Sequence, residues 1–298
     1  MSSHPIAAYT TTAADTGKRL DVCAAEHLEM LASRKAAYKC AKRGELLLNG
    51  RAADPQTQVA HPATIQVLPP TRLPPRPYHL AVEVVWEDCY LAVVVKPPGI
   101  PVSGNYARTL ERALPASLAP SLAADAMPWP RPVHRLDAPT GGLLLVAKTA
   151  GAMVALGRQF QERSVRKRYC AVVTGRLDAP LTLDSPLDER PARTRCLPLH
   201  HARSLRSDWL TTLDVWPETG RTHQIRRHLA AAGHPVLGDA AYGSEPILRS
   251  KGLFLWAVEL RFTHPFLGAA IQITVDPPPK FSAQLRRETQ RWEASSIT

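Results

Sequence analysis

Long hydrophobic runs are absent from this sequence. Its longest apolar stretches, residues 91–95 and 143–147, fall far short of the ~18 residues that a membrane-spanning helix needs, and they suit buried strands instead. Residues 1–5 read MSSHP, without the basic and long apolar segments of a secretory signal. We therefore expect a soluble protein that makes no use of a membrane.

Paired cysteines are absent as well. The five cysteines are scattered, and none forms a C-x-x-C pair. An odd, unclustered set indicates reduced thiols and a cytoplasmic location. The scatter also argues against structural zinc, and His, Cys and carboxylate groups do not cluster at the spacing of a catalytic metal site. We expect neither a metal nor a cofactor.

Internal repeats and heptad runs are also missing. What remains is a chain of 298 residues, 45% hydrophobic, which can bury a core in one large domain or in two unequal ones. Its formal charge of +11 favours a polyanionic partner such as nucleic acid. An arginine-rich soluble surface would give the same charge, so net charge alone does not decide.

Composition divides the chain into segments. Residues 69–77 read PPTRLPPRP, and this density of proline forbids a helix or a central strand and predicts a stiff linker. The linker separates a small domain, residues 17–68, from a large domain, residues 78–285. We expect a loose tail at each end of the chain, residues 1–16 and 286–298.

The small domain reads as a compact α/β unit. Ser33 is a good N-cap for its second helix and Gly44 a good stop. Asn49-Gly50 predicts a tight hairpin turn. The expected elements are helices over 20–31 and 34–43 and strands over 45–48 and 64–68.

The second of these helices is strongly basic. Its cations are Arg34, Lys35, Lys39, Lys42 and Arg43. The three lysines are spaced i, i+4 and i+7 and share a face, which is usually just a solvated face. Like charges at this spacing cost helix stability, and only Glu45 follows closely to relieve them. Phosphate groups of a nucleic acid would supply the missing counter-charge.

The large domain is rich in strands and lacks a regular βαβ alternation. We expect an α+β fold, with a mainly antiparallel mixed β-sheet and flanking helices. The expected strands cover 82–86, 91–96, 142–148, 169–174, 211–215 and 271–275, and the expected helices cover 150–163 and 222–232.

Residues 134–142, which read HRLDAPTGG, place a carboxylate beside two basic residues in a loop that opens into an apolar strand. The strand fixes the loop, so Asp137 would be presented at its mouth. A lone aspartate of this kind more often simply caps the turn that follows, here at residues 139–140.

Residues 220–229, which read GRTHQIRRHL, are too polar for a core helix. Thr222 can cap the helix, and Arg226 offers a planar fork suited to one carboxylate. A metal site formed by His223 and His228 is a poor interpretation, because i, i+5 does not place both on one face.

Residues 167–175, which read KRYCAVVTG, predict a strand on which Tyr169, Ala171 and Val173 share a face. An isolated strand tyrosine is usually a core residue. Its ring could also stack on a nucleobase.

These three segments, in this order, resemble the signature stretches of RluA-type pseudouridine synthases. The family's H-R-L-D-x-x-T-S-G resembles residues 134–142, with Gly141 in place of the serine. K-x-Y-x-A-x-V-x-G matches residues 167–175, and G-R-T-H-Q-I-R-x-H matches residues 220–228. The match continues as G-H-P-V-L-G-D-x-x-Y from 233 to 242.

Flanking segments extend the resemblance. Residues 95–102 resemble the family's lysine-proline-glycine segment, and 262–265 its late strand turn, although Trp256 replaces a common histidine. The small domain resembles the S4-type RNA-binding domain. Its matching residues are 19–21, 33–34, 42–44 and 48–51, with His61-Pro62-Ala63 in place of the usual glycine-aspartate.

The resemblance implies a cofactor-free isomerisation of uridine in RNA to pseudouridine. Asp137 corresponds to the essential carboxylate, Arg135 to the arginine that helps evict the target base, and Tyr169 to the tyrosine that stacks on the uracil. Arg226 corresponds to the arginine paired with the aspartate. Further expected RNA contacts are His134, Thr140, Lys167, Arg221, His223 and Ile225, together with the basic helix residues Arg34, Lys35, Lys39, Lys42 and Arg43.

Several alternatives stay open at this point. Asp137 could attack carbon or remove a ribose proton. Ribosomal RNA is the expected substrate and transfer RNA the alternative, with the chain acting as a monomer. The rival functions are a non-catalytic RNA-binding protein and a hydrolase that uses Asp137 and His223 as an acid–base pair, which leaves the tyrosine segment unexplained.

Overall fold

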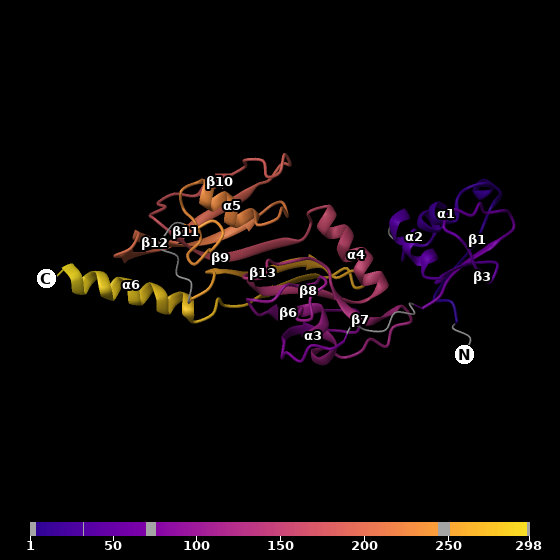
Figure 1. The fold of residues 1–298 in the computed structure, drawn as a ribbon, viewed down its shortest axis with the longest axis horizontal. Coiled ribbons are helices and arrows are strands. Elements are labelled where there is room, and N and C mark those ends of the chain that lie inside the picture. The colour runs from indigo at the N-terminus through magenta and orange to yellow at the C-terminus, as the bar shows by residue number, and fades with distance from the viewer. Residues whose placement is uncertain (1–3, 32, 70–75, 244–250, 297–298) are drawn as a thin grey trace.

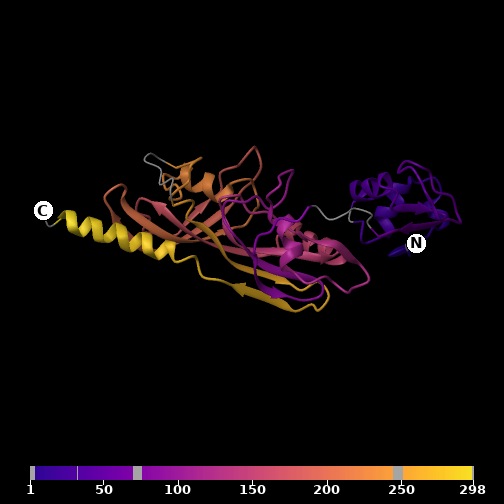
Figure 2. The same ribbon diagram turned by 60° about the horizontal axis from the view of Figure 1, so that its bottom comes forward.

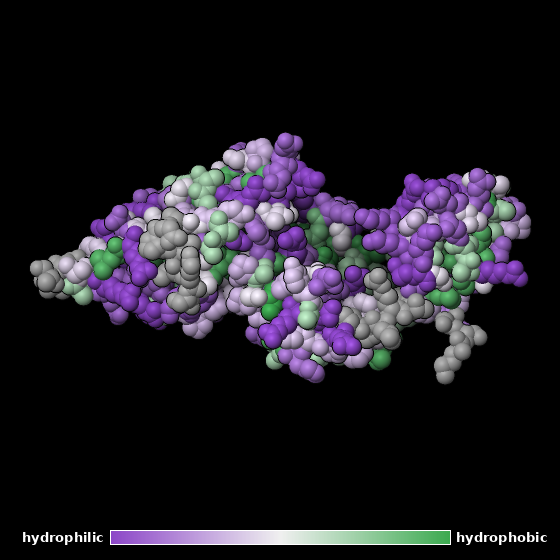
Figure 3. Space-filling view, in the orientation of Figure 1, coloured by the Kyte–Doolittle hydropathy of each residue, from purple (hydrophilic) through white to green (hydrophobic). Residues whose placement is uncertain are grey.

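The computed structural model describes residues 4–31, 33–69, 76–243 and 251–296 of the chain, and they form two separate β-sheets. Figure 1 shows the small sheet with its two helices at one end of the molecule and a long C-terminal helix at the other. Figure 2, turned by 60°, shows the same arrangement. The face drawn in Figure 3 is mainly hydrophilic, with hydrophobic residues in scattered spots.

The small sheet has four strands in the order β1-β4-β2-β3. Its helices and strands are α1 (Leu20–His27), α2 (Arg34–Lys42), β1 (Ala7–Thr10), β2 (Leu46–Leu48), β3 (Arg51–Ala52) and β4 (Thr64–Val67). The Ser33 hydroxyl accepts a hydrogen bond from the amide of Ala36 at 3.2 Å, which confirms the predicted helix cap. Asn49 and Gly50 both have positive φ, as the predicted hairpin turn requires.

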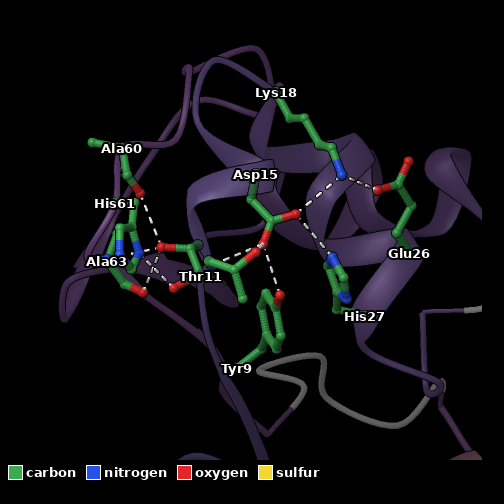
Figure 4. Close-up of polar contacts among 10 residues, drawn as sticks. Tyr9, Thr11, Asp15, Lys18, Glu26, His27, Ala60, His61 and Ala63 are labelled. Carbon is green, nitrogen blue, oxygen red and sulfur yellow. Dashed lines mark hydrogen bonds and ion pairs between the residues drawn. The ribbon is translucent and has the colours of Figure 1, made fainter.

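The expected loose N-terminal tail is wrong from residue 7 onward. Strand β1 pairs with β4, and a short 3₁₀ helix, η1 (Ala13–Asp15), follows it. The buried Asp15 carboxylate accepts hydrogen bonds from Tyr9 Oη at 2.7 Å, from the amide of Thr12 at 2.9 Å and from Lys18 Nζ at 3.0 Å (Figure 4). These hydrogen bonds hold the segment in place. They could not be predicted from a polar stretch that is rich in threonine.

The large sheet has ten strands in the order β10-β11-β12-β9-β13-β8-β6-β5, with β14 paired to β13 and β7 paired to β8. All these pairings are antiparallel except that of β13 with β8. This confirms the predicted mainly antiparallel mixed sheet. The strands are β5 (Glu83–Glu87), β6 (Leu91–Lys96), β7 (Ala126–Pro132), β8 (Gly141–Thr149), β9 (Arg166–Thr174), β10 (Leu181–Leu183), β11 (Thr194–Ser204), β12 (Asp208–Pro217), β13 (Leu255–Thr263) and β14 (Ala270–Thr274).

In the described residues four helices flank this sheet, and all nine residues of the central strand β8 are buried. The helices are α3 (Leu110–Ser117), α4 (Ala150–Gln161), α5 (Gln224–Ala231) and α6 (Lys280–Ser296). Helices α4 and α5 lie where the sequence predicts them. Within the described ranges, the structure contains no helix with the length and hydropathy of a membrane span.

The expected C-terminal tail is also wrong, because α6 continues through most of it and packs on β11. The hydroxyl of Ser204 donates to the buried carboxylate of Glu288 at 2.9 Å. The guanidinium carbon of Arg203 lies over two indole rings, 3.9 Å from the centroid of Trp209 and 4.7 Å from that of Trp292. These contacts hold the helix against the sheet.

Candidate active site

The loop between β7 and β8 presents a carboxylate to a pocket. The amide of Thr140 donates to the carbonyl of Asp137 at 3.0 Å, which closes a turn, and Leu136 is buried beneath it. The Asp137 carboxylate contacts two residues outside that turn. It lies 3.4 Å from Arg226 Nη1 and 3.7 Å from His223 Nε2, with 15% of the side chain exposed. Turn capping therefore does not account for this aspartate.

Arg226 is buried on α5 and contacts two carboxylates. Its Nε and Nη2 donate to the two oxygens of Asp239, both at 2.7 Å, and its Nη1 donates to Asp137 Oδ2. The bidentate pair with Asp239 is the shorter and fixes the plane of the guanidinium. Asp239 lies in a segment that matches the family, but its role was not predicted from the sequence.

Asp239 is itself held by its own turn, where its Oδ1 accepts hydrogen bonds from the amides of Ala241 and Tyr242. Burial by itself would raise the pKa of Asp239, but the hydrogen bonds from Arg226 and from these amides outweigh it and leave the pKa below its ordinary value. Asp239 is therefore a charged anchor for the arginine that reaches Asp137.

The start of α5 differs from the expectation that Thr222 caps it. The N-cap residue is His223, which has a positive φ of 53° and no side-chain capping bond, while Thr222 is exposed. The His223 Nδ1 lies 2.9 Å from Tyr242 Oη, and its Nε2 faces Asp137. His228 lies elsewhere, with Thr194 Oγ1 and the carbonyl of Ser185 each 2.9 Å from its ring. The two histidines do not form a pair.

Tyr169 and Asp137 line the same cavity of 130 Å³. Tyr169 stands on β9 with 7% of its surface exposed. Burial, and then the negative charge of Asp137, raise the pKa of its phenol. Thr140, Arg135, Lys167, Arg221, His223, Ile225 and Arg226 line this cavity too. The structure thus gathers three distant sequence segments around Asp137.

Lys96 supports the Asp137 loop, a role that was not predicted from the sequence. It is fully buried at the end of β6, and its ammonium donates to the carbonyls of Pro97 at 2.8 Å, Ala138 at 3.1 Å and Thr140 at 2.8 Å. Burial lowers the pKa of Lys96 to about 8, and the charge of Asp137 opposes that shift. In the sequence, Lys96 stands out as a lysine at the end of an otherwise apolar strand.

A larger cavity of 790 Å³ adjoins the first, and six residues line both. Glu259 and Glu218 are its only carboxylates among the described residues that line it. Its walls carry seven cationic side chains: Arg135, Arg163, Arg166, Lys167, Arg195, Arg221 and Arg261. This is a positively charged groove next to the carboxylate.

His134 stands in the wall of this groove. Its Nε2 accepts a hydrogen bond from the amide of Leu145 at 3.1 Å, and its ring stacks on Phe160 with centroids 4.7 Å apart. Burial, and then the charge of Lys167, lower the pKa of His134 to about 3. The ring is therefore neutral near pH 7, and it ties the start of the Asp137 loop to β8.

The basic helix α2 is better compensated than its sequence indicates. Its Arg34 pairs with Asp21, its Lys42 with Asp54 at 2.8 Å, and its Arg43 with Glu45. Glu45 is therefore not the only carboxylate that offsets the positive charge of α2. Of the five cations, Lys35 and Lys39 have no carboxylate partner in the part of the chain that the structure describes, and both are exposed.

One group of side chains in the described ranges has metal-ligand spacing: Asp15, Cys23 and His27. Asp15 already receives hydrogen bonds from Tyr9, Thr12 and Lys18 (Figure 4). Burial raises the pKa of Cys23 to about 11, so the thiol resists becoming the thiolate that a metal requires. These residues do not fit a metal ion.

This chain is similar to several known proteins. The profile of a family described as RNA pseudouridylate synthase matches residues 90–231. A ribosomal large subunit pseudouridine synthase D of Nitrosomonas europaea is 35% identical over 239 residues, covering 74% of this chain and 68% of the relative. A second protein of that name, from Xanthomonas campestris, is 33% identical over 305 residues and covers 92% and 91%.

Solved structures show the same fold. The human RNA pseudouridylate synthase domain containing 1 superposes with a TM-score of 0.55 at 26% identity, covering 66% of this chain and 84% of its own. The similar proteins place this chain in the class of RNA-modifying isomerases. The chain belongs to the RNA pseudouridine synthase family, and within it to the RluA type.

Proposed function

We propose that this RNA pseudouridine synthase modifies uridine in ribosomal RNA of the large subunit, with Asp137 as its catalytic carboxylate. The observation that carries the assignment is the position of Asp137, which lines one cavity together with Tyr169 and contacts Arg226. The names of the similar proteins from Nitrosomonas and Xanthomonas support the choice of RNA. We place the reaction in the cytoplasm and assign it to a monomer.

The reaction balances without an external reagent. The bond from N1 of uracil to C1′ of ribose breaks, the uracil rotates while it is held, and C5 bonds to C1′. The hydrogen on C5 leaves as a proton, and N1 gains one. Asp137 serves either as the nucleophile or as the base, and both roles need a carboxylate held in a fixed orientation. Arg226 supplies that orientation from its clamp on Asp239.

The target base must leave its stack before its sugar can reach Asp137. In this proposal Tyr169 packs against the extruded uracil, and Arg135 fills the space that the base vacates. Phosphates bind along the groove, where Arg135, Arg163, Arg166 and Lys167 have no carboxylate partner among the described residues. His134, Thr140, Arg221, His223 and Ile225 complete the walls around the nucleotide.

The small domain binds the same RNA through α2, as its resemblance to an S4-type domain implies. Lys35 and Lys39 are exposed and unpaired within the described chain, so they are the cations of this helix most available to phosphates. Arg34, Lys42 and Arg43 would first have to share or release their own carboxylates.

The test uses RNA labelled with tritium at C5 of uridine, because the reaction releases that hydrogen to water. Unmodified transcripts of large-subunit ribosomal RNA and of transfer RNA serve as separate substrates. The native chain should release label from the ribosomal transcript. Asp137→Asn should release essentially none while it binds the RNA with similar affinity, since the amide keeps the shape but not the charge.

Asp178→Asn is the matched control, because Asp178 is exposed and pairs with Arg176 rather than with the site. It should behave like the native chain. Undiminished release from Asp137→Asn would assign the chemistry to another residue, and release from transfer RNA alone would overturn the proposed substrate. Binding without release from either RNA would favour the non-catalytic rival, and free uracil in place of tritiated water would favour the hydrolase.

A further inference from the structure

The positively charged groove contains an aromatic side chain that takes no part in the proposed reaction. Trp216 lies near the end of β12 and lines the 790 Å³ cavity with its side chain partly exposed. It belongs to none of the buried hydrophobic clusters formed by the described residues. Tyr169, by contrast, is a member of the main cluster. Packing therefore does not explain why a tryptophan stands here.

Arg195 holds this indole from the neighbouring strand. The two residues are direct partners in the β11–β12 register, and the guanidinium carbon of Arg195 lies 5.6 Å from the centroid of the Trp216 ring. Arg195 is in turn 3.8 Å from a carboxylate oxygen of Glu218. The arginine is thus tethered, and the tryptophan is presented to the cavity with a cation against its ring.

The Trp216 groove is continuous with the site around Asp137. Pro217, Thr219, Gly220 and Arg221, which follow Trp216 in the chain, line both cavities, as do Arg135 and Lys167 on the opposite segments. An RNA strand whose target uridine occupies the smaller cavity therefore has its neighbouring nucleotides in the larger one. Cations line that path for its phosphates.

We propose that Trp216, backed by Arg195, is a stacking platform for a second unpaired nucleobase of the substrate RNA, adjacent to the target uridine. An indole offers a base a large apolar face, and every base has a face that can stack on it. The platform holds the strand open after the target base has turned out. This inference rests on the proposed function, because it assigns the larger cavity to the flanking nucleotides of the same substrate.

The first measurement is binding of hexauridylate, a single-stranded probe, followed by fluorescence anisotropy. Trp216→Ala and Trp216→Leu should weaken binding about ten- to a hundredfold, which is the range expected for loss of one stacked base. Trp216→Phe should stay within a few fold of the native chain, because it keeps an aromatic face. Trp129→Ala is the control: Trp129 is also a partly exposed tryptophan on a strand, β7, but it does not line the groove.

Salt dependence separates stacking from a change in charge. Removal of a phosphate contact lowers the slope of log affinity against log salt by about 0.7 for a single strand. Trp216→Ala should lower affinity at every salt concentration and leave that slope unchanged. Native affinity in Trp216→Ala and Trp216→Leu would overturn the platform. So would an equally large decrease in Trp216→Phe or Trp129→Ala, since either would indicate a general structural effect.

Tritium release then distinguishes this inference from the proposed function. On the ribosomal transcript, Trp216→Ala should raise KM about ten- to a hundredfold and change kcat much less, because its role is to bind the strand. Native turnover together with unchanged KM in Trp216→Ala would reject the platform and keep the synthase assignment. Trp216-dependent binding of hexauridylate with no tritium release by the native chain would support the platform and reject the proposed substrate and catalytic assignment.

Discussion

Gly141 and Trp256 share one packed position. They are register partners in the parallel pairing of β8 with β13, and the indole ring occupies the space beside the glycine. A Cβ added at Gly141 would overlap Cζ3 of Trp256 and would lie 2.7 Å from its Cε3. The two departures from the family pattern, glycine for serine and tryptophan for histidine, therefore meet at one packed position, and we expect their effects on stability to be coupled.

This coupling predicts the outcome of restoring the family residues. Gly141→Ser alone should destabilise the protein by about 1–3 kcal/mol, because it overpacks the site. The double variant Gly141→Ser with Trp256→His should recover most of that stability. Urea unfolding of the native chain, both single variants and the double variant measures the coupling as a double-mutant cycle. Simple addition of the two single effects would contradict it.

Replacement of Asp239 should damage turnover through Arg226. Asp239→Asn removes the charge that holds the buried guanidinium, and removal of one partner of a buried pair costs ~3–5 kcal/mol. Turnover should fall at least about tenfold as Asp137 is deprived of its oriented donor. Asp188→Asn is the control, since Asp188 pairs with the partly exposed Arg227 on the same helix. Equal effects of the two variants on kcat would remove Asp239 from its positioning role.

The pH dependence of stability should report His134. Its pKa in the folded chain is about 3, whereas an unfolded histidine titrates near ~6.5. Between these values the unfolded chain binds the proton and the folded chain does not, so the free energy of unfolding falls as the pH drops from ~6.5 toward 3. His134→Gln should show a smaller fall over that window by urea unfolding. A pH profile identical to that of the native chain would show that folding does not lower the pKa of His134.

Removal of residues 286–298 should not be neutral. The truncation deletes Glu288 and Trp292, and with them a charged hydrogen bond to Ser204 and a cation–aromatic contact to Arg203. Together these contribute about 2–4 kcal/mol. Urea unfolding should show a lower midpoint in the truncated chain. An unchanged midpoint would mean that the end of α6 contributes no stability.

The lysines of α2 should differ in their contribution to RNA binding. Lys35→Gln with Lys39→Gln should reduce the slope of log affinity against log salt by a little under one for each phosphate that the helix no longer binds. Lys42→Gln should change it less, because Lys42 already pairs with Asp54. Titration of the ribosomal transcript at several salt concentrations measures both. Equal slopes for the two variants would argue that α2 does not approach the RNA as proposed.

The local sequence pattern predicted the secondary structure well where a segment is uniformly apolar. Residues 91–96 form the predicted strand without a shift, and the predicted helix over 150–163 is α4. Strand β13 was missed, although most of its residues are buried. Its Glu259 pairs with Arg168 on another strand, and such a partner offsets the desolvation of a charge that sequence rules place at the surface.

The same reason limits how much of the site could be predicted. The motif segments were sufficient to bring Asp137, Tyr169 and Arg226 together. Asp239 and Lys96 are buried charges, and each becomes understandable only through contacts made in the folded chain. From the local sequence pattern alone, a lysine or an aspartate in a short turn is predicted to be exposed to solvent.

The contacts that fix the Asp137 loop affect which uridines can serve as substrates. Lys96 holds the carbonyls of Ala138 and Thr140, which follow Asp137, and His134 ties the start of the loop to β8. The Arg226–Asp239 clamp holds the carboxylate itself. A loop fixed at both flanks cannot follow a sugar that is poorly placed. We therefore expect the RNA, rather than the loop, to change its conformation when the two bind. Uridines in rigid duplex would then be poor substrates, and those in pliable stretches would be converted first, whatever their neighbouring bases.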